Sequence, residues 1–190
     1  MSFRNEEKIH LNKSKLFLFK DYLYKKKAQK IFETRKINSI YFDNKNLDMY
    51  NHSIEGLVPR KKIRIRYYNE NKDNLFFETK ISSAEGRYKV SKKLRNINIL
   101  KGVTDFDYGM TYPVSVVSYD RSYYSLNNTR ITIDENIVYK KYKNNRTYKD
   151  SNIVAEIKSS FEYPKDIIEE LFPFTRIRFS KYCNSIEKCF

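Results

Sequence analysis

The chain has 190 residues, of which 40% are hydrophobic and 16% aromatic, including 17 tyrosines and 13 phenylalanines. This length and composition predict one folded domain over residues 1–190, and they exclude a disordered basic tail. The 38 lysines and arginines outnumber the 23 aspartates and glutamates, so the net charge is +15, which predicts a polyanionic partner: nucleic acid, anionic lipid or phosphate chains.

The chain carries no signal for a membrane span or for secretion. No uncharged stretch approaches the roughly 20 residues that a membrane span needs, and acidic residues come early at the N-terminus. The two cysteines, Cys183 and Cys189, lack a zinc-site spacing and are too few for a disulfide framework. We therefore expect reduced thiols in a soluble, cytoplasmic protein.

Strand patterns dominate the chain. The expected strands are, in chain order, 5–11, 37–43, a basic strand containing 62–66, then 74–82, 87–94, 113–124, 129–142, 152–160 and 175–179. The expected helical segments are 14 to about 35, a short turn at 47–50, 165–172, and a final turn from Ser180. This succession predicts an α+β, β-rich fold: a closed antiparallel β-barrel tunnel of about eight strands with a few flanking helices.

One side of these strands is charged. In residues 62–66 bases alternate with isoleucines, so Arg64 and Arg66 share one face of a strand and Ile63 and Ile65 the other. Other strands repeat this polarity. The charged face would hold Glu6, Lys8, Arg64, Arg66, Glu78, Lys80, Arg87, Lys89, Lys93, Tyr119, Arg121, Arg130, Thr132, Asp134, Glu156, Lys158, Arg176 and Arg178.

Two arrangements of these faces are open. A sandwich would bury the isoleucines and leave the charges in water, whereas a barrel could turn the charges into its lumen and the isoleucines outward beneath helices. The barrel needs compensating groups, because an unpaired buried charge is costly. Glu6, Glu78, Asp134 and Glu156 supply some of them, and a bound polyanion with Mg²⁺ or Mn²⁺ would supply the rest. Glu6, Glu78 and Glu156 are thus candidate metal ligands, and Lys158 and Arg178 candidate substrate contacts.

Several segments in chain order resemble the VTC (vacuolar transporter chaperone) polyphosphate polymerase domain of the CYTH-like triphosphate tunnel metalloenzymes. They are residues 40–43 with 47–50 and Gly56, 60–67, 77–80, 119–121, 154–158 and 179–182, within a resemblance that spans about Arg4 to Ile186. The resemblance implies a tunnel that binds a triphosphate or polyphosphate chain. It also implies a phosphotransferase that passes the γ-phosphoryl of ATP to polyphosphate and uses Mn²⁺ or Mg²⁺.

The resemblance also implies roles for individual residues. Phosphate contacts would come from Lys8, Arg64, Arg66, Lys80, Lys89, Arg121 and Lys181. Tyr119 and Ser180 would add hydrogen bonds, and Glu156 would hold the catalytic ion. The first strand of the superfamily commonly reads Glu-x-Glu-x-Lys; here Arg4 replaces the first acid, which favours a polymerase over a triphosphatase. Lys92 is an alternative to Lys89 on the charged face.

Other functions and purely structural roles stay open. The same fold could act as a tripolyphosphatase or nucleoside triphosphatase, and a non-catalytic module could bind polyphosphate or RNA. No nucleic acid partner is expected, because the surface signature of a common RNA-binding sheet is missing. A membrane-protein partner and the oligomeric state are open. Glu156 could form only an ion pair, Arg121 could only stack on aromatic rings, and Ser180 could be only a helix cap.

Overall fold

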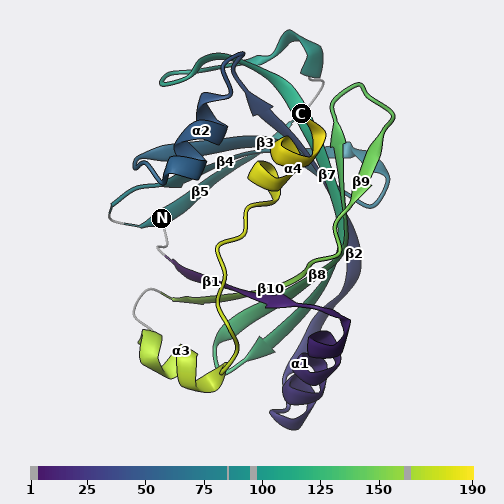
Figure 1. The fold of residues 1–190 in the computed structure, drawn as a ribbon, viewed down its shortest axis with the longest axis vertical. Coiled ribbons are helices and arrows are strands. Elements are labelled where there is room, and N and C mark those ends of the chain that lie inside the picture. Colours follow the sequence, from purple (N-terminus) through teal and green to yellow (C-terminus); the bar gives the residue numbers. More distant parts are fainter. Residues whose placement is uncertain (1–3, 85, 95–97, 161–163) are drawn as a thin grey trace. The chain divides into compact units, whose positions relative to one another are not determined.

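The computed structural model describes residues 4–84, 86–94, 98–160 and 164–190. The strands there are β1 (Arg4–Leu11), β2 (Gln29–Asp43), β3 (Arg60–Tyr68), β4 (Asn71–Ser82), β5 (Arg87–Leu94), β6 (Val103–Asp105), β7 (Gly109–Leu126), β8 (Thr129–Lys141), β9 (Thr147–Lys149) and β10 (Ile153–Ser160) (Figure 1). The helices are α1 (Lys13–Lys25), α2 (Asp48–Glu55), α3 (Lys165–Leu171) and α4 (Lys181–Cys189), with a short 3-10 turn, η1 (Ile99–Lys101). The β-rich α+β class is confirmed.

The strands form an open ladder and not the closed barrel that we expected. Hydrogen bonds link them in the order β1-β10-β8-β7-β2-β3-β4-β5, with β6 paired to β7 and β9 to β8. Within the described residues the two end strands, β1 and β5, do not pair. The outer edge of β1 is instead occupied by the segment before α4. There the N–H of Ile177 donates to the carbonyl of Lys8 at 2.9 Å, and Arg176 forms a β-bridge with Ile9.

The chain divides into two compact units. Unit 1 comprises Met1–Arg35, Tyr119–Ile137 and Asp150–Phe179, and unit 2 comprises Lys36–Ser118, Val138–Lys149 and Ser180–Phe190. The long strands β2, β7 and β8 contribute residues to both units.

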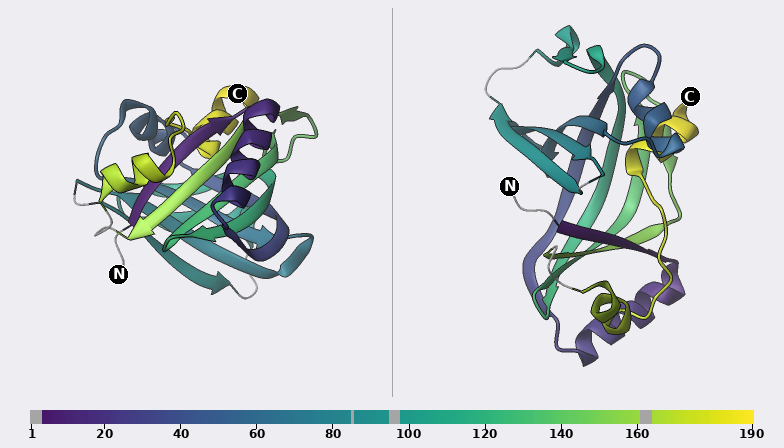
Figure 2. Two further views of the ribbon diagram at one scale, coloured as in Figure 1. Left: turned by 90° about the horizontal axis from the view of Figure 1, so that it is seen from below. Right: turned by 90° about the vertical axis from the view of Figure 1, so that its left-hand side faces the viewer.

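Unit 1 packs the apolar side of its strands against helices, as in the barrel arrangement that the alternation left open. Register pairs Ile9 with Ala155 and Ala155 with Ile133, so these side chains share one face of β1, β10 and β8. Helices α1 and α3, which lie below β1 in Figure 1 and in the right-hand view of Figure 2, contribute to the core on that face. The buried members of this core are Ile9, Leu11, Phe19, Leu23, Leu126, Ile131, Ile133, Ile153, Ala155, Ile157, Ile168 and Phe172.

Unit 2 buries the isoleucines of the basic strand. Ile63 and Ile65 are 1% and 0% exposed, and they pair with Phe42 and Ile40 of β2. Helices α2 and α4 contact each other, and α2 contacts β3. The N-terminus of α2 is held by the carboxylate of Asp43, which accepts three backbone N–H groups at 2.8, 3.1 and 3.0 Å.

The helix predicted from Ser14 to about Arg35 is wrong in its second half. Helix α1 begins after the N-cap Asn12, whose side chain accepts from the Lys15 N–H at 2.8 Å, and it ends at Lys25. Lys27 then takes a positive φ of 57°, and β2 starts two residues later. The pairing of β2 with β7 and β3 is non-local, so a helix-like run of apolar residues could not reveal it.

The C-terminal segment differs from the prediction in the same way. The strand expected at 175–179 is wrong, because only the single bridge at Arg176 is present there. The side chain of Arg176 anchors this irregular segment: it donates to Glu7 at 2.6 Å and to the carbonyls of Phe174 at 2.6 Å, Ile168 at 3.2 Å and Phe172. The helix expected from Ser180 is confirmed as α4.

Candidate functional site

A buried carboxylate organises the basic face of unit 2. Glu78 of β4 is 3% exposed, and its Oε2 accepts from Arg64 Nε at 2.8 Å and lies 2.7 Å from Arg64 Nη2. The same oxygen lies 3.5 Å from Arg66 Nη1, and Oε1 accepts from Lys89 Nζ at 2.9 Å. Burial favours the protonated form, but Arg64, Arg66 and Lys89 outweigh it and hold the pKa of Glu78 well below its usual range.

These contacts bear on the predicted metal ligand at Glu78. Both carboxylate oxygens are in contact with cationic groups of β3 and β5, so Glu78 acts as the counterion of Arg64 and Arg66. A divalent cation at this position would face three positive side chains. The oxygens of Glu78 are therefore poorly suited to hold a metal ion. The metal role predicted for Glu78 stays a prediction, and the positive side chains around it disfavour that role.

Lysines line the next row of the same face. Register places Lys80 of β4 between Lys62 of β3 and Lys89 of β5, so the three side chains share the face of Arg64 and Glu78. Lys92 pairs with Phe77 and lies on the opposite face. Of the two alternatives left open by the sequence, Lys89 is thus the one on the charged face.

The start of α4 meets this row of lysines. The hydroxyl of Ser180 caps the helix by accepting from the Cys183 N–H at 3.2 Å, and it also accepts from Lys62 Nζ at 2.8 Å. Lys181 is the first residue of α4. A helix N-terminus is electropositive, so Ser180 and Lys181 add to the attraction of this face for anions.

An aromatic network contacts Arg64 from β2, whereas Glu78 contacts it from β4 on the other side of β3. Arg64 Nη1 donates to the Tyr41 hydroxyl at 3.1 Å, and the Tyr41 ring stacks on Tyr182 of α4 with centroids 5.1 Å apart. The Tyr182 hydroxyl donates to the buried carboxylate of Asp43. Burial raises the pKa of Asp43 despite this bond and those from the start of α2. We did not predict roles for Tyr41 and Tyr182, although both lie within the segments that carry the family resemblance.

Unit 1 carries a second charged face, on the side of β1 and β10 opposite its apolar core. Register pairs Glu6 with Lys158 and Lys8 with Glu156, so four charges alternate in a two-by-two checkerboard. Along the strands, Lys158 Nζ lies 2.7 Å from Glu156 Oε1, and Lys8 Nζ lies 3.7 Å from Glu6 Oε1. Lys8 Nζ also donates to the carbonyl of Phe179 at 2.6 Å.

Arginine and aspartate extend this face onto β7 and β8. Arg121 Nε and Nη2 donate to the two carboxylate oxygens of Asp134 at 2.5 and 2.6 Å, and Asp134 is fully buried. The Arg121 guanidinium also lies 5.2 Å from the ring centroid of Tyr119. Burial disfavours the charged guanidinium, but Asp134, Tyr119 and Glu156 together hold the pKa of Arg121 above its ordinary value.

The structure thus gathers the predicted residues into two groups. Unit 2 holds Arg64, Arg66, Glu78, Lys80, Lys89, Ser180 and Lys181. Unit 1 holds Glu6, Lys8, Tyr119, Arg121, Glu156 and Lys158. Arg178 is exposed in the irregular segment before α4, where the strand alternation that placed it on the charged face does not apply.

The oxygens of unit 1 fit a divalent ion better than those of unit 2. Among the described residues no group of three or more His, Cys, Asp and Glu side chains could hold a metal. Glu6 and Glu156 are diagonal neighbours across β1 and β10, and two carboxylates completed by phosphate oxygens suit Mg²⁺ or Mn²⁺. Thr132, opposite Glu156, adds a hydroxyl that is 2% exposed and makes no hydrogen bond to the described residues.

The structural roles left open by the sequence are present too. Glu156 forms its ion pair with Lys158, Arg121 lies over Tyr119, and Ser180 caps α4. We placed Thr132 on the charged face but gave it no role, and we did not predict a contribution from Lys62. The period-two alternation that placed Arg64 could have found Lys62, because it is two residues away on the same strand.

Solved structures from several organisms share this fold. A Bacillus halodurans protein described as a candidate adenylate cyclase is 15% identical, with a TM-score of 0.62 over 100% of this chain and 98% of that chain. A Hippeastrum candidate adenylyl cyclase, described as having a dominant triphosphatase activity, is 13% identical, with a TM-score of 0.61 over 100% and 97%. A Pyrococcus horikoshii protein is 16% identical, with a TM-score of 0.59 over 96% and 99%.

The remaining comparisons concern the sequence itself. No curated protein sequence matches the chain. Within the described ranges, no helix has the length and apolar content to cross a membrane. Residues 3–107 and 105–190 both match the family model described as the VTC domain. Since these matches span nearly the whole chain, the protein belongs to the VTC domain family.

Proposed function

We propose that the protein is a metal-dependent polyphosphate polymerase that passes the γ-phosphoryl of ATP to the end of a polyphosphate chain. The observation that carries this proposal is the burial of charge on the sheet face opposite the apolar core: Arg66, Glu78, Arg121 and Glu156 are each less than 9% exposed. A face that only met water would not hold these groups so deeply. The VTC domain match supports the same reading and supports a single domain over 1–190.

The two groups of residues would divide the work. Arg64, Arg66, Lys80, Lys89 and Lys181 would bind phosphate oxygens, with the arginines doing so in bidentate fashion. In unit 1, Lys8, Arg121 and Lys158 would do the same, with a hydrogen bond from Tyr119. Ser180 would add a hydrogen bond in unit 2. Arg178, although exposed, remains a proposed substrate contact.

Glu156 and Glu6 would hold Mn²⁺ or Mg²⁺. A divalent ion there would neutralise charge on the phosphate oxygens during transfer. In the reaction, the bond between the γ-phosphorus and the oxygen it shares with the β-phosphate breaks, and a terminal oxygen of the polyphosphate bonds to that phosphorus. ADP leaves with the electron pair. Because ATP is the proposed donor, we place the activity in the cytoplasm.

The same charged faces would suit hydrolysis of a triphosphate, with water as the acceptor. The triphosphatase activity described for the Hippeastrum protein makes this the second candidate, although a likeness at 13% identity carries the fold alone. Incubation of the purified chain with ATP and Mn²⁺, with products resolved on a gel, separates the two. Long polyphosphate supports the polymerase, and orthophosphate alone supports the triphosphatase.

Two variants test whether the charged faces carry the reaction. Glu156→Gln and Arg66→Ala should each lower ATP turnover by ~10²-fold or more, since the first would remove a ligand of the divalent ion and the second a contact to the reacting phosphates. Glu170→Gln and Arg146→Ala change exposed residues of the same types and should leave turnover unchanged. Unchanged turnover in Glu156→Gln and Arg66→Ala would refute the role of the charged faces in the reaction. An unmodified chain that binds polyphosphate but does not turn over ATP would instead be a non-catalytic polyanion-binding module.

A further inference from the structure

Helix α1 has a second apolar side that is not packed against unit 1. Its inner side contributes Phe19 and Leu23 to the buried core. Phe17, Leu18 and Tyr24, on the same helix, are 73%, 59% and 83% exposed. Phe17 and Tyr24 are seven residues apart and so lie on one side of the helix, next to Leu18. We call Phe17, Leu18 and Tyr24 the outer face of α1.

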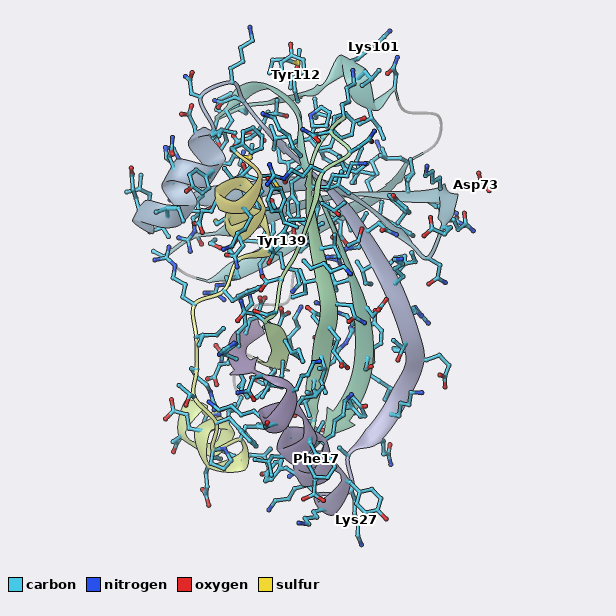
Figure 3. All side chains as sticks on the ribbon, turned by 45° about the vertical axis from the view of Figure 1, so that its right-hand side comes forward. Phe17, Lys27, Asp73, Lys101, Tyr112 and Tyr139 are labelled. Carbon is cyan, nitrogen blue, oxygen red and sulfur yellow. The ribbon has the colours of Figure 1, made fainter. Side chains whose placement is uncertain are left out.

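Lysines surround this outer face. Between residues 13 and 27 the one acid is Asp21, which lies 2.7 Å from Lys25. Figure 3 shows Phe17 and Lys27 projecting at the same end of unit 1. The exposed lysines of this stretch are Lys13, Lys15, Lys20, Lys25, Lys26 and Lys27.

The inner side of α1 is held firmly, so the outer face is a fixed surface. The ring of Phe19 packs edge-on against the ring of Phe174, with centroids 5.0 Å apart. The ring of Tyr22 packs against the same Phe174 ring, with centroids 5.5 Å apart. The hydroxyl of Tyr22 donates to the carbonyl of Leu171. Docking of the outer face would therefore not require the helix to leave its core.

We propose that the outer face of α1 docks on an anionic lipid bilayer, with the helix lying in the plane of the interface. Aromatic and aliphatic side chains at such an interface enter the headgroup region, while flanking lysines reach the lipid phosphates. An anionic plane can meet the exposed Lys13 and Lys27 beside the outer face, while Lys20 and Lys25 form ion pairs with Glu135 and Asp21 at 3.0 and 2.7 Å. A second copy of the chain would bring the same excess of lysines and would be repelled.

A free polyanion fits this surface less well than a bilayer does. Polyphosphate or RNA backbone would pair with the lysines but would leave the aliphatic Leu18 and the ring of Phe17 in water. A bilayer accommodates both kinds of side chain. This proposal stands on α1 alone and does not depend on the reaction proposed for the charged faces.

The test is co-sedimentation of the purified full chain with vesicles of phosphatidylcholine, with and without phosphatidylserine. We expect binding to the phosphatidylserine vesicles and loss of that binding at high salt. The combined change Phe17→Ser, Leu18→Ser and Tyr24→Ser should weaken it by about tenfold or more. Phe106→Ser, a matched change at a residue 99% exposed in unit 2, should not.

A second variant keeps the proposal testable if the first set disturbs the fold. Lys13→Gln, Lys15→Gln and Lys27→Gln leave the apolar side chains intact and should also weaken sedimentation with phosphatidylserine vesicles. Three results would overturn the proposal: no sedimentation of the unmodified chain with these vesicles, equal loss in Phe106→Ser, or binding unaffected by the lysine changes. ATP turnover measured in the same variants should be unchanged, so failure here is distinct from failure of the proposed reaction.

Discussion

Replacing Glu78 with glutamine isolates the electrostatic role of that carboxylate, because glutamine keeps the shape and one carbonyl acceptor. In the folded protein the change leaves two guanidinium groups, whose side chains are 18% and 9% exposed, without their counterion. Removing one partner of a buried ion pair costs about 3–5 kcal/mol. Lys89 adds little, because its side chain is 48% exposed. We expect a loss near the lower end, about 3 kcal/mol, since Arg64 keeps its bond to Tyr41.

That loss corresponds to a fall in Tm of roughly 6–12 °C for a chain of this size. Thermal and denaturant unfolding measure it, with Glu170→Gln as the control at an exposed glutamate. Added tripolyphosphate should raise the Tm of Glu78→Gln more than that of the unmodified protein, because phosphate can replace the missing anion. A loss below about 1 kcal/mol, together with weaker Mn²⁺ binding, would refute the counterion role and favour a metal ligand at Glu78.

The pH dependence gives an independent check on the same carboxylate. The folded-state pKa of Glu78 is lowered, so its stabilising contribution is complete above the ordinary glutamate pKa of about 4.3 and is lost as pH falls below it. The difference in unfolding free energy between the unmodified protein and Glu78→Gln should therefore shrink below that pH. A difference that stays constant into acid would contradict the pairing.

Three further substitutions test other parts of the structure. Thr132→Val should raise the unfolding free energy by about 1 kcal/mol, because its buried hydroxyl has no hydrogen bond to the described residues; a loss of stability would show a hidden partner. Tyr182→Phe should lower it by about 1–2 kcal/mol by removing the bond to Asp43, and no change would mean that water replaces the hydroxyl. Arg121→Lys should lower it by about 1–3 kcal/mol, since lysine cannot make both bonds to Asp134; an unchanged Tm would argue against the bidentate pair.

Strand alternation predicted the composition of both charged faces because side chains on a strand have a period of two. The same rule assigned the isoleucines to the buried apolar side, and Ile63 and Ile65 are buried as expected. A helix cap depends on residues that are close in sequence, so Ser180 could be placed at the start of α4 from the sequence around it.

The predictions that were wrong all concern segments whose hydrogen-bond partners are distant in the chain. Ile31 follows Ala28 at helical spacing and so extends the apolar stripe of the preceding helix, but pairing with β7 makes residues 29–35 strand. Residues 175–179 alternate like a strand, yet Arg176 bonds to carbonyls near α3 and to Glu7, which leaves a single bridge. Closure of the ladder depends on which segment occupies the edge of β1, and that segment, at Arg176 and Ile177, is distant in the chain from both β1 and β5.

The checkerboard on β1 and β10 bears on the order in which ligands arrive. Glu6 and Glu156 each have a lysine beside them along the strand and another across it, so these four charges already balance one another. A cation entering alone would have to displace lysines, and an anion entering alone would have to displace carboxylates. When the two enter together, the phosphates take the lysines and the ion takes the carboxylates, so every charge exchanges one opposite partner for another. On the proposed function, this face favours a metal–polyphosphate complex over either component and leaves little net charge for salt to screen.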